Sequence, residues 1–413
     1  MSPSPPTALL VLLLVFAAVV CNETTHASAL NATTNMGVSP QKVERIQRYL
    51  EKINKPAVKS IKSPDGDIID CVLMNKQLAF DHPLLKNHKI QRVAPNRPAL
   101  RSEAANQQPR NETASRAWQA WNHVENCPVG TVSVRRTTVE DVLRAGSLSR
   151  FLRKKVLKRI ASEPYTGHEY AVAYVDQQQA YGTKAIIDVW DPSVEFSSEF
   201  SLSQIWLIAG SYENEDLNTV EVGWQVLGGS SAPRLFIYWT RDAYASTGCY
   251  NLVCPGFVQT NNQVVLGGAI TSVSTYNATQ REITLLVRKD PNSGNWWLSY
   301  QNIDVGYWPA EIFTHLASYA TLVEWGGEIV NDDVNGQHTT TQMGSGHFAE
   351  EGYRKASYFR NVEVVNSTNA LSSPQSVSTI AGNPNCYDIQ TFFNASWGSY
   401  FFYGGPGRNP ECP

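Results

Sequence analysis

The sequence lacks the motifs that mark the most familiar hydrolase and nucleotide chemistries. It contains no G-x-S-x-G elbow, no H-E-x-x-H pair, no phosphate-binding loop and no dinucleotide fingerprint. Its histidines are few and scattered, and His315, His338 and His347 are more simply explained as structural residues than as metal ligands. Serine and metal-dependent hydrolases are therefore disfavoured. We expect no cofactor and no metal, and carboxylates remain as the source of any chemistry.

Long hydrophobic runs are also missing, apart from one near the N-terminus. The run from Ala8 to Val20 is too short to span a bilayer, and small residues follow it. It has the character of a signal peptide covering residues 1–27, with cleavage near Cys21 or Ala27, although no Lys or Arg precedes the run. We therefore expect a secreted protein whose mature form has no membrane segment.

Cysteine is scarce, and its pattern fits an oxidising compartment. Of seven cysteines, Cys21 belongs to the predicted signal peptide, so six remain for three disulfides. Many connectivities are possible. Pairing cysteines that are close in sequence and lie in the same predicted domain favours Cys71–Cys127, Cys249–Cys254 and Cys386–Cys412, and nothing else in the sequence selects among the pairings. The spacing of the middle pair suits a hairpin disulfide better than a cysteine nucleophile.

Asparagine sequons point to the same compartment. Six N-x-S/T sequons occur, at Asn22, Asn31, Asn111, Asn277, Asn366 and Asn394. N-glycosylation requires such a sequon on the surface of a secreted protein. The last five follow both predicted cleavage points, and they are the predicted glycosylation sites.

The net charge of −3 hides a strong asymmetry along the chain. Residues 1–161 hold 24 Lys and Arg and 12 Asp and Glu, whereas residues 162–413 hold 10 and 25. A basic first part beside an acidic second part indicates two bodies that attract each other, and the alternative is two independent solvated faces. Nucleic-acid binding is disfavoured, because the basic part carries sequons and follows a signal peptide.

The first part of the chain predicts a small domain of mixed secondary structure. Ser39 as N-cap and Pro40 at the first helical position predict a helix start, and Pro56 ends an apolar series at helical spacing: Val43, Ile46, Leu50 and Ile53. Residues 59–72 predict short strands around an Asp-Gly turn. A second helix is predicted from Thr138 to the basic run at 150–159. The composition changes beside that run, so we predict a processing boundary there and a propeptide at 28–161.

From His168 onward the sequence pattern is typical of an all-β domain. Short β-branched and aromatic runs alternate with turn signals, and strands are predicted at 184–190, 234–239 and 282–287 with turns at 290–294 and 335–336. A short helix is predicted only at 310–319. The pattern favours an antiparallel β-sandwich of two sheets over residues 162–413.

Two glutamates in this second part stand out. Glu221 lies between Val220 and Val222, so strand alternation sends its side chain to the face opposite the valines. Glu328 follows Gly326 and Gly327, where a substrate backbone can approach or the strand can bend. Two carboxylates that share a half-buried site can divide the roles of general base and general acid. The simpler alternative is that each glutamate is a salt-bridged or rim residue.

Several long segments carry a resemblance to a known family. From Pro56 to Pro413 the chain resembles the plant neprosin family, which comprises secreted glutamic peptidases made as zymogens with an N-terminal activation peptide. The resemblance is carried by the segments 54–61 (NKPAVKSI), 80–85 (FDHPLL), 200–206 (FSLSQIW), 247–251 (TGCYN), 306–309 (GYWP), 342–347 (QMGSGH) and 403–408 (YGGPGR).

The resemblance implies a two-sheet sandwich with a long cleft that cleaves proteins and peptides after proline at acidic pH. It implies that Glu221 and Glu328 are the catalytic pair, and does not extend catalysis to Glu324 or Glu311. Family members often carry Gln at the first of the two positions, so Glu221 favours an active enzyme. It further implies that the propeptide inhibits its own catalytic domain and that the protein is extracellular, in the apoplast or cell wall.

We expect one glutamate to activate a water and the other to protonate the substrate, without an acyl-enzyme, and the sequence does not assign the two roles. An aromatic subsite would select proline, with Trp224, Trp239, Tyr307 and Trp325 as candidates. A basic propeptide would leave the acidic domain as its carboxylates become neutral near pH ~4. The alternatives are a glycoside hydrolase, since a carboxylate pair also cleaves sugars, and an inactive glycan- or peptide-binding module of the cell wall.

Overall fold

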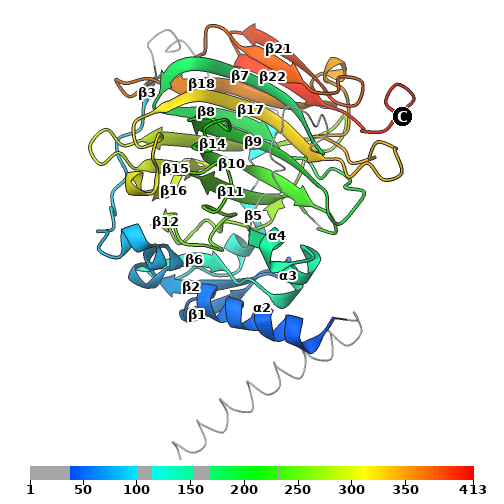
Figure 1. Cartoon of the computed structure of the whole chain (residues 1–413). Coiled ribbons are helices and arrows are strands. Elements are labelled where there is room, and N and C mark those ends of the chain that lie inside the picture. Colours follow the sequence, from blue (N-terminus) through cyan, green and yellow to red (C-terminus); the bar gives the residue numbers. More distant parts are fainter. Residues whose placement is uncertain (1–37, 101–113, 117, 153–166, 231) are drawn as a thin grey trace, which may run out of the picture.

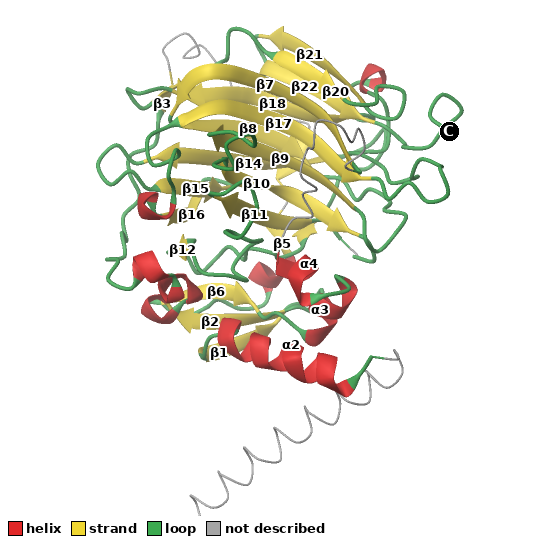
Figure 2. Cartoon of the chain, viewed as in Figure 1, coloured by secondary structure: helices red, strands yellow, loops and turns green. Residues whose placement is uncertain are grey.

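The computed structural model describes residues 38–100, 114–116, 118–152, 167–230 and 232–413. A small N-terminal domain lies beneath a large sandwich of two β-sheets in the view of Figure 1. Figure 2 shows that helices gather in the N-terminal domain, whereas the sandwich is almost entirely strand. The prediction of an all-β antiparallel sandwich preceded by a small mixed domain is confirmed.

The first helix of the N-terminal domain begins and ends where its sequence predicts. In α2 (Pro40–Ile53), the Ser39 side chain accepts a hydrogen bond from the backbone N–H of Lys42, and Pro40 fills the first helical position. The predicted apolar stripe of this helix is buried, and it packs against Val139 and Val142 of α3 (Val139–Arg144). Burial of this stripe fixes the helix on its domain, since a short helix has little stability of its own.

A small antiparallel sheet completes the N-terminal domain. Its strand order is β1-β2-β6, and the predicted Asp-Gly turn joins its first two strands. The strands are β1 (Ala57–Lys62), β2 (Ile68–Leu73) and β6 (Thr131–Arg135). In the described part of the segment between β2 and β6, four 3-10 turns form: η1 (Met74–Lys76), η2 (Leu78–Asp81), η3 (Pro83–Leu85) and η5 (Ala120–His123).

The second predicted helix is shorter than the sequence suggested. It is divided into α3, which ends at Arg144, and α4 (Leu148–Leu152). Gly146 between them has a φ of 77°, a left-handed conformation that ends a helix and that glycine adopts without steric cost. The rest of the basic run and the predicted processing boundary lie outside the described residues.

One sheet of the sandwich has six strands in the order β11-β10-β9-β17-β7-β20, and every neighbouring pair is antiparallel. The strands are β7 (His168–Ala180), β9 (Phe200–Ala209), β10 (Asn218–Leu227), β11 (Arg234–Thr240), β17 (Ala320–Val330) and β20 (Ser378–Ala381).

The other sheet has eleven strands and includes two short strands from the N-terminal domain. β3 (Ala99–Leu100) pairs in parallel with β19, and β4 (Ala114–Arg116) pairs in parallel with β14. The nine strands of the sandwich itself are β8 (Gly182–Asp188), β12 (Val258–Gln259), β14 (Gln280–Lys289), β15 (Trp296–Tyr300), β16 (Ile303–Trp308), β18 (Ser357–Val365), β19 (Ala370–Ser372), β21 (Asp388–Asn394) and β22 (Gly398–Gly404).

The main core lies between the two sheets. Val222, Ile205 and Trp325 point into it from three adjacent strands of the six-stranded sheet, and Ile187 and Leu285 meet them from the other sheet. The predicted strands within 184–190, 234–239 and 282–287 are confirmed as β8, β11 and β14. The predicted helix at 310–319 is wrong in extent, because only the 3-10 turn η6 (Ala310–Ile312) forms there.

Three smaller elements complete the described chain. β5 (Trp118–Gln119) of the N-terminal domain pairs with β13 (Ile270–Thr271) of the sandwich, and η7 (Ala349–Glu351) precedes β18. In the described ranges, no helix is both long enough and apolar enough to cross a membrane. The predicted signal peptide lies outside these ranges.

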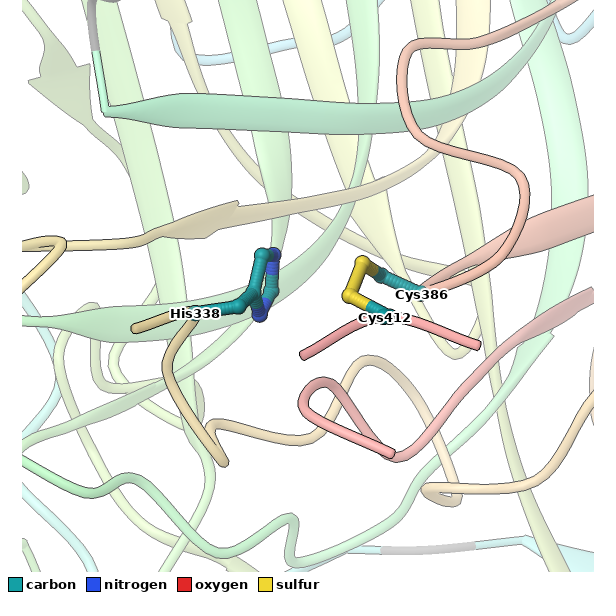
Figure 3. A group of neighbouring side chains, drawn as sticks. All are labelled: His338, Cys386 and Cys412. Atoms are coloured by element: carbon teal, nitrogen blue, oxygen red, sulfur yellow. A yellow bond between two sulfur atoms is a disulfide. The ribbon is translucent and has the colours of Figure 1, made fainter. Parts of the chain in front are cut away.

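Three disulfides join Cys71 to Cys127, Cys249 to Cys254, and Cys386 to Cys412, which are the pairs favoured by locality. His338 lies beside the third of them (Figure 3). Its two ring nitrogens contact the Thr339 carbonyl and Glu169, and both sulfurs are bonded to each other. This group is therefore a structural staple, because oxidised sulfurs do not ligate a metal as thiolates do.

Candidate active site

Glu221 and Glu328 lie on the face of the six-stranded sheet that points away from the other sheet. We call this the outer face. Glu221 on β10 pairs with Trp206 of β9, and Glu328 on β17 pairs with Leu202 of the same strand. Trp206 and Leu202 alternate with core residues of β9, so all four side chains share the outer face. β9 thus lies between the two glutamates.

Gln204, midway between Leu202 and Trp206, connects the two carboxylates. Its side-chain Nε2 donates to Glu221 Oε2 at 3.2 Å and to Glu328 Oε2 at 3.5 Å. All three side chains are fully buried, at 0 % exposure. The two glutamates therefore share one site, and in the full-length chain solvent does not reach it.

Glycines flank Gln204 on both neighbouring strands. Gly223 of β10 and Gly326 of β17 each pair with Gln204 in the sheet register. A Cβ on Gly223 would lie 2.0 Å from the carbonyl oxygen of Ser203, and one on Gly326 would lie 2.2 Å from that of Ala171. Close approach of the neighbouring strands therefore requires glycine at both positions. As a result, the row between the glutamates carries only the Gln204 side chain.

Hydroxyl groups hold the carboxylate of Glu221. Its Oε1 accepts from the Tyr244 hydroxyl at 2.6 Å and from the Thr219 hydroxyl at 2.9 Å. Burial, and after it the negative charge of Glu221, raises the pKa of Tyr244 well above its usual value. The tyrosine therefore keeps its proton and donates it in this hydrogen bond.

An imidazole and a hydroxyl hold the carboxylate of Glu328. Its Oε1 lies 2.6 Å from His168 Nδ1 and 3.3 Å from the Tyr170 hydroxyl, and both partners come from β7. The His168 side chain is only 4 % exposed. The two carboxylates thus have different surroundings: Glu221 contacts two hydroxyls, Glu328 contacts an imidazole and a hydroxyl, and both contact the Gln204 amide.

Further aromatic residues surround Glu221 on the outer face. Tyr238 pairs with it across the sheet, and the rings of Tyr244 and Tyr250 lie 5.6 Å and 4.9 Å from that of Tyr238. Together with Trp206, these three tyrosines are called the outer aromatic group below.

The predicted aromatic subsite does not lie on the outer face with the glutamates. Its four members belong to the main core between the sheets, and each is at most 2 % exposed: Trp224, Trp239, Tyr307 and Trp325. The indole N–H of Trp224 donates to the Asp188 carbonyl, and that of Trp325 donates to the Thr183 hydroxyl of the opposite sheet. Trp325 is three residues from Glu328, an odd spacing that places it on the other face of the strand. Trp325 was the favoured candidate because it is close to Glu328 in the sequence, and that closeness was misleading.

A cavity of about 380 Å³ continues along the outer face beyond the glutamates. Phe200, Gln225 and Val330 line it from the sandwich, and Ile53 and Phe151 line it from the N-terminal domain. The N-terminal domain therefore closes one end of this face, as expected for a segment that restricts access to the site.

Charge complementarity between the two parts is less simple than the composition predicted. His88 of the N-terminal domain lies 3.1 Å from Glu311 of the sandwich, so the basic and acidic partners are on the predicted sides. The Glu311 carboxylate is largely exposed, and such a contact contributes little to the attraction between the two parts. The buried contact has the opposite sign, because Arg234 of the sandwich donates to Asp67 of the N-terminal domain at 2.6 Å. Asp67 also accepts from Arg135 at 2.9 Å.

The remaining candidate residues are dispersed. His315 and His347 contact the partly exposed carboxylates of Asp216 and Glu351, respectively, and not the glutamate pair. Of the predicted glycosylation sites, Asn277 and Asn394 are exposed and Asn366 is half-buried, while Asn31 and Asn111 lie outside the described residues.

Sequence reasoning missed Gln204, His168, Tyr170, Thr219 and Tyr244. A signal existed for Gln204, since it is a polar residue at the centre of a strand whose other outer-face positions, Leu202 and Trp206, are apolar. A signal also existed for Thr219, which lies two residues before Glu221 and therefore shares its face of β10. His168, Tyr170 and Tyr244 reach the site through sheet register and through the loop after β11, which a single sequence does not specify.

Comparison with known proteins gives two family matches. The neprosin family matches residues 197–406, and the neprosin activation peptide family matches residues 60–174. Among solved structures, Scytalido-glutamic peptidase with a peptide-based transition-state analogue is 12 % identical over 58 % of this chain and 98 % of its own, with a TM-score of 0.33.

Two further solved structures show a similarly distant likeness. SCP-B, a member of the eqolisin family of peptidases in complex with the tripeptide Ala-Ile-His, is 10 % identical over 58 % of this chain and 98 % of its own, with a TM-score of 0.30. The apo Crh5 transglycosylase is 14 % identical over 38 % of this chain and 56 % of its own, with a TM-score of 0.22.

The family matches follow the two parts of the fold. The activation peptide match spans the described N-terminal domain from β1 onward and extends into β7, and the neprosin match spans the sandwich from the residues before β9 to the last strand. The chain therefore belongs to the neprosin family of peptidases, with an activation peptide preceding its neprosin domain.

Proposed function

We propose that the protein is a secreted glutamic endopeptidase, made as a zymogen, that hydrolyses peptide bonds after proline at acidic pH. The observation that carries this proposal is the contact of one Gln204 nitrogen with both Glu221 and Glu328. Two buried carboxylates at one site suit a general base and a general acid, and the site needs no cofactor for this chemistry.

The different surroundings of the two carboxylates support an assignment of roles. The imidazole of His168 lies 2.6 Å from Glu328, and a ring N–H that donates to this carboxylate stabilises its ionised form. Glu328 then serves as the base that takes a proton from water, and that water attacks the carbonyl carbon of the scissile bond. Glu221, whose contacts include the neutral groups of Thr219, Tyr244 and Gln204, is assigned the role of general acid.

Proton transfer through the pair completes the hydrolysis. Glu221 donates its proton to the carbonyl oxygen as the tetrahedral intermediate forms. The proton taken up by Glu328 then passes to the leaving nitrogen, and the C–N bond breaks as the carbonyl re-forms and returns its proton to Glu221. Both carboxyl groups end as they began, and no covalent enzyme intermediate is needed.

The outer aromatic group is the proposed subsite for proline. Its rings lie next to Glu221 and present flat apolar surfaces, and aromatic-lined grooves are a recurring way to bind proline-rich chains. This group replaces the core residues that the sequence suggested.

The zymogen proposal rests on the burial of both carboxylates in the full-length chain. A substrate cannot reach groups that are 0 % exposed, so residues must leave the outer face before catalysis. We propose a signal peptide at 1–27, an inhibitory propeptide at 28–161 and a catalytic domain at 162–413, with an extracellular location in the apoplast or cell wall.

The proposal is tested by acid incubation of the purified protein with a library of proline-containing peptides. Wild type is compared with Glu221→Gln, Glu328→Gln and Glu324→Gln, and the last is a matched control because Glu324 lies on the same face of the same strand. Wild type and the control should lose the propeptide and cut after proline, while the other two should do neither. Cutting by either dyad variant at the wild-type rate would refute the proposal, and cuts at unrelated bonds would refute its specificity.

A further inference from the structure

Gln204 has a geometry that two glutamates alone do not explain. A primary amide carries two N–H donors, and here its single nitrogen lies within hydrogen-bonding distance of one oxygen from each carboxylate. The reverse orientation of the amide would put its oxygen against an oxygen of the ionised Glu328, which repels it. The chemistry of the site therefore fixes which end of Gln204 faces the glutamates.

The other end of the amide is a buried acceptor without a partner. Gln204 Oε1 is one of the few buried side-chain oxygens in the described ranges that have no hydrogen-bond partner. A buried polar atom left unpaired is unfavourable, because it has lost its hydrogen bonds to water and gained none in exchange. A leucine would avoid that cost, and Leu202, the neighbouring outer-face residue of β9, is one. The glutamine is thus retained at a stability cost, as expected where a reactant supplies the missing partner.

The two strands beside Gln204 contribute no side chain to its row of the outer face. Gly223 and Gly326 flank Gln204 in the register, so no side chain from either adjacent strand fills the row. A water in this row would lie between the base and the acid. It would have one hydrogen directed at a carboxylate and the second free for another acceptor.

We infer that Gln204 is a positioning residue of the active site, whose Nε2 holds both glutamates and whose Oε1 orients the attacking water. This inference rests on the proposed function of the Glu221 and Glu328 pair. By accepting the second O–H of the water, Gln204 directs a lone pair of the water oxygen toward the scissile carbonyl carbon. Gln204 gains and loses no proton during the reaction.

The test compares two exchanges at Gln204 with the same exchange elsewhere. Gln204→Leu keeps the approximate volume and removes both hydrogen-bonding functions. Gln204→Glu keeps the shape, and its side chain offers an O–H donor and a carbonyl acceptor only when protonated. Gln280→Leu is the matched control, since Gln280 is also buried, has an unpartnered Oε1 and lies on β14 of the other sheet.

Each variant is processed in trans by tagged wild-type protein, which is then removed, so that failure to self-activate does not mask the result. For Gln204→Leu we expect kcat to fall about 100-fold with KM within about threefold of wild type, as when one preorganised polar group is removed from an active site. Gln204→Glu should match that loss near pH 5.5 and recover at least about tenfold relative to Gln204→Leu by pH 3. Gln280→Leu should retain wild-type kcat.

The outcomes separate this inference from the function on which it rests. Wild-type activity that is lost in Glu328→Gln supports the dyad. With the dyad supported, a Gln204→Leu kcat within about threefold of wild type would overturn the role of Gln204 alone, as would a constant ratio between the two Gln204 variants at every pH. A merely structural glutamine would give that constant ratio. If Gln204→Leu does not fold, judged by its thermal unfolding, the pH dependence of Gln204→Glu decides the question. An active Glu328→Gln would overturn the dyad and this inference together.

Discussion

The two faces of the six-stranded sheet are made by the same strands but have opposite chemistry. The inner face is occupied by apolar residues such as Ile205, Val222 and Trp325 that meet the other sheet. The outer face carries Glu221, Gln204 and Glu328 within an apolar and aromatic frame. Every residue of β9 is buried, so burial does not distinguish the two faces. The distinction is which polar groups are present and which partners they have.

The largest expected effect comes from removing a large side chain from the inner face, which should lower stability without changing the site on the outer face. Trp325→Ala should lower the free energy of unfolding by about 3–5 kcal/mol, because it leaves a cavity in the main core and strands the Thr183 hydroxyl without its donor. Chemical denaturation of the full-length protein measures this loss. Cleavage specificity of the folded fraction should not change, and a change in the residue accepted before the cut would show that Trp325 does reach the substrate.

An outer-face exchange should affect turnover rather than stability. Tyr244→Phe removes the hydroxyl that donates to Glu221 at 2.6 Å. That hydroxyl stabilises the carboxylate that Glu221 becomes once it has given its proton to the substrate, so we expect kcat to fall about 10- to 30-fold. Steady-state kinetics after activation measures it. Tyr174→Phe is the control, since Tyr174 pairs with Glu324 on the same face. Equal kinetics for both variants would contradict the role of Tyr244.

Arg135 of the N-terminal domain pairs with both Asp141 and Asp67, and Asp67 pairs with Arg234 of the sandwich. This ion-pair group allows the comparison to be tested through pH. Burial opposes ionisation of Asp141, but hydrogen bonds and charge from Arg135, with help from Thr138 and Arg144, outweigh it and lower the pKa of Asp141. A lowered pKa means that this carboxylate stabilises the fold above its unfolded pKa of about 3.9, and that the contribution is lost as pH falls further.

Asp141→Asn should therefore destabilise the full-length chain by about 1–2 kcal/mol at pH 7 and by much less at pH 3. Thermal unfolding in a Glu328→Gln background, which prevents self-cleavage, gives both values. The variant should also lose its propeptide at a higher pH than wild type. A destabilisation of equal size at both pH values would show that Asp141 contributes packing and not charge.

The smallest expected effect concerns the contact between His338 and Glu169. Burial tends to lower the pKa of His338, but its hydrogen bonds to Glu169 and to the Thr339 carbonyl, and the charges of Glu169 and Glu199, raise it overall. The stabilisation is then fully present below about pH 6.5 and is lost as pH rises through the folded-state pKa. Stability should fall by about 0.5–1 kcal/mol between pH 5 and pH 8 for this reason, and His338→Gln should remove that part of the change. An unchanged pH dependence in the variant would contradict the assignment.

Local sequence signals were sufficient for the elements that local chemistry specifies. The Ser39-Pro40 start of α2 and the β-branched and aromatic runs of β8, β11 and β14 formed as predicted, because capping and alternation act within a few residues. The break at Gly146 was missed, since a single glycine can end a helix or be tolerated within it.

The site was predicted only in part for a related reason. Alternation placed Glu221 opposite its valines, yet it could not say which sheet face is the core, so Trp325 was assigned to the wrong side. The pairing of Gln204 with Gly223 and Gly326 depends on register across three strands that are far apart in sequence. Such long-range register is the part of a β-fold that a single sequence specifies least.

Covalent labelling of carboxyl groups by an epoxide reagent, followed by mass spectrometry, tests the central claim most directly. In the full-length chain at neutral pH, Glu221 and Glu328 should remain unmodified because both are fully buried. After acid activation, modification of either one should appear and activity should disappear at the same rate. Labelling of both before activation, or full activity with either glutamate modified, would contradict the account of a buried glutamate pair that becomes the active site.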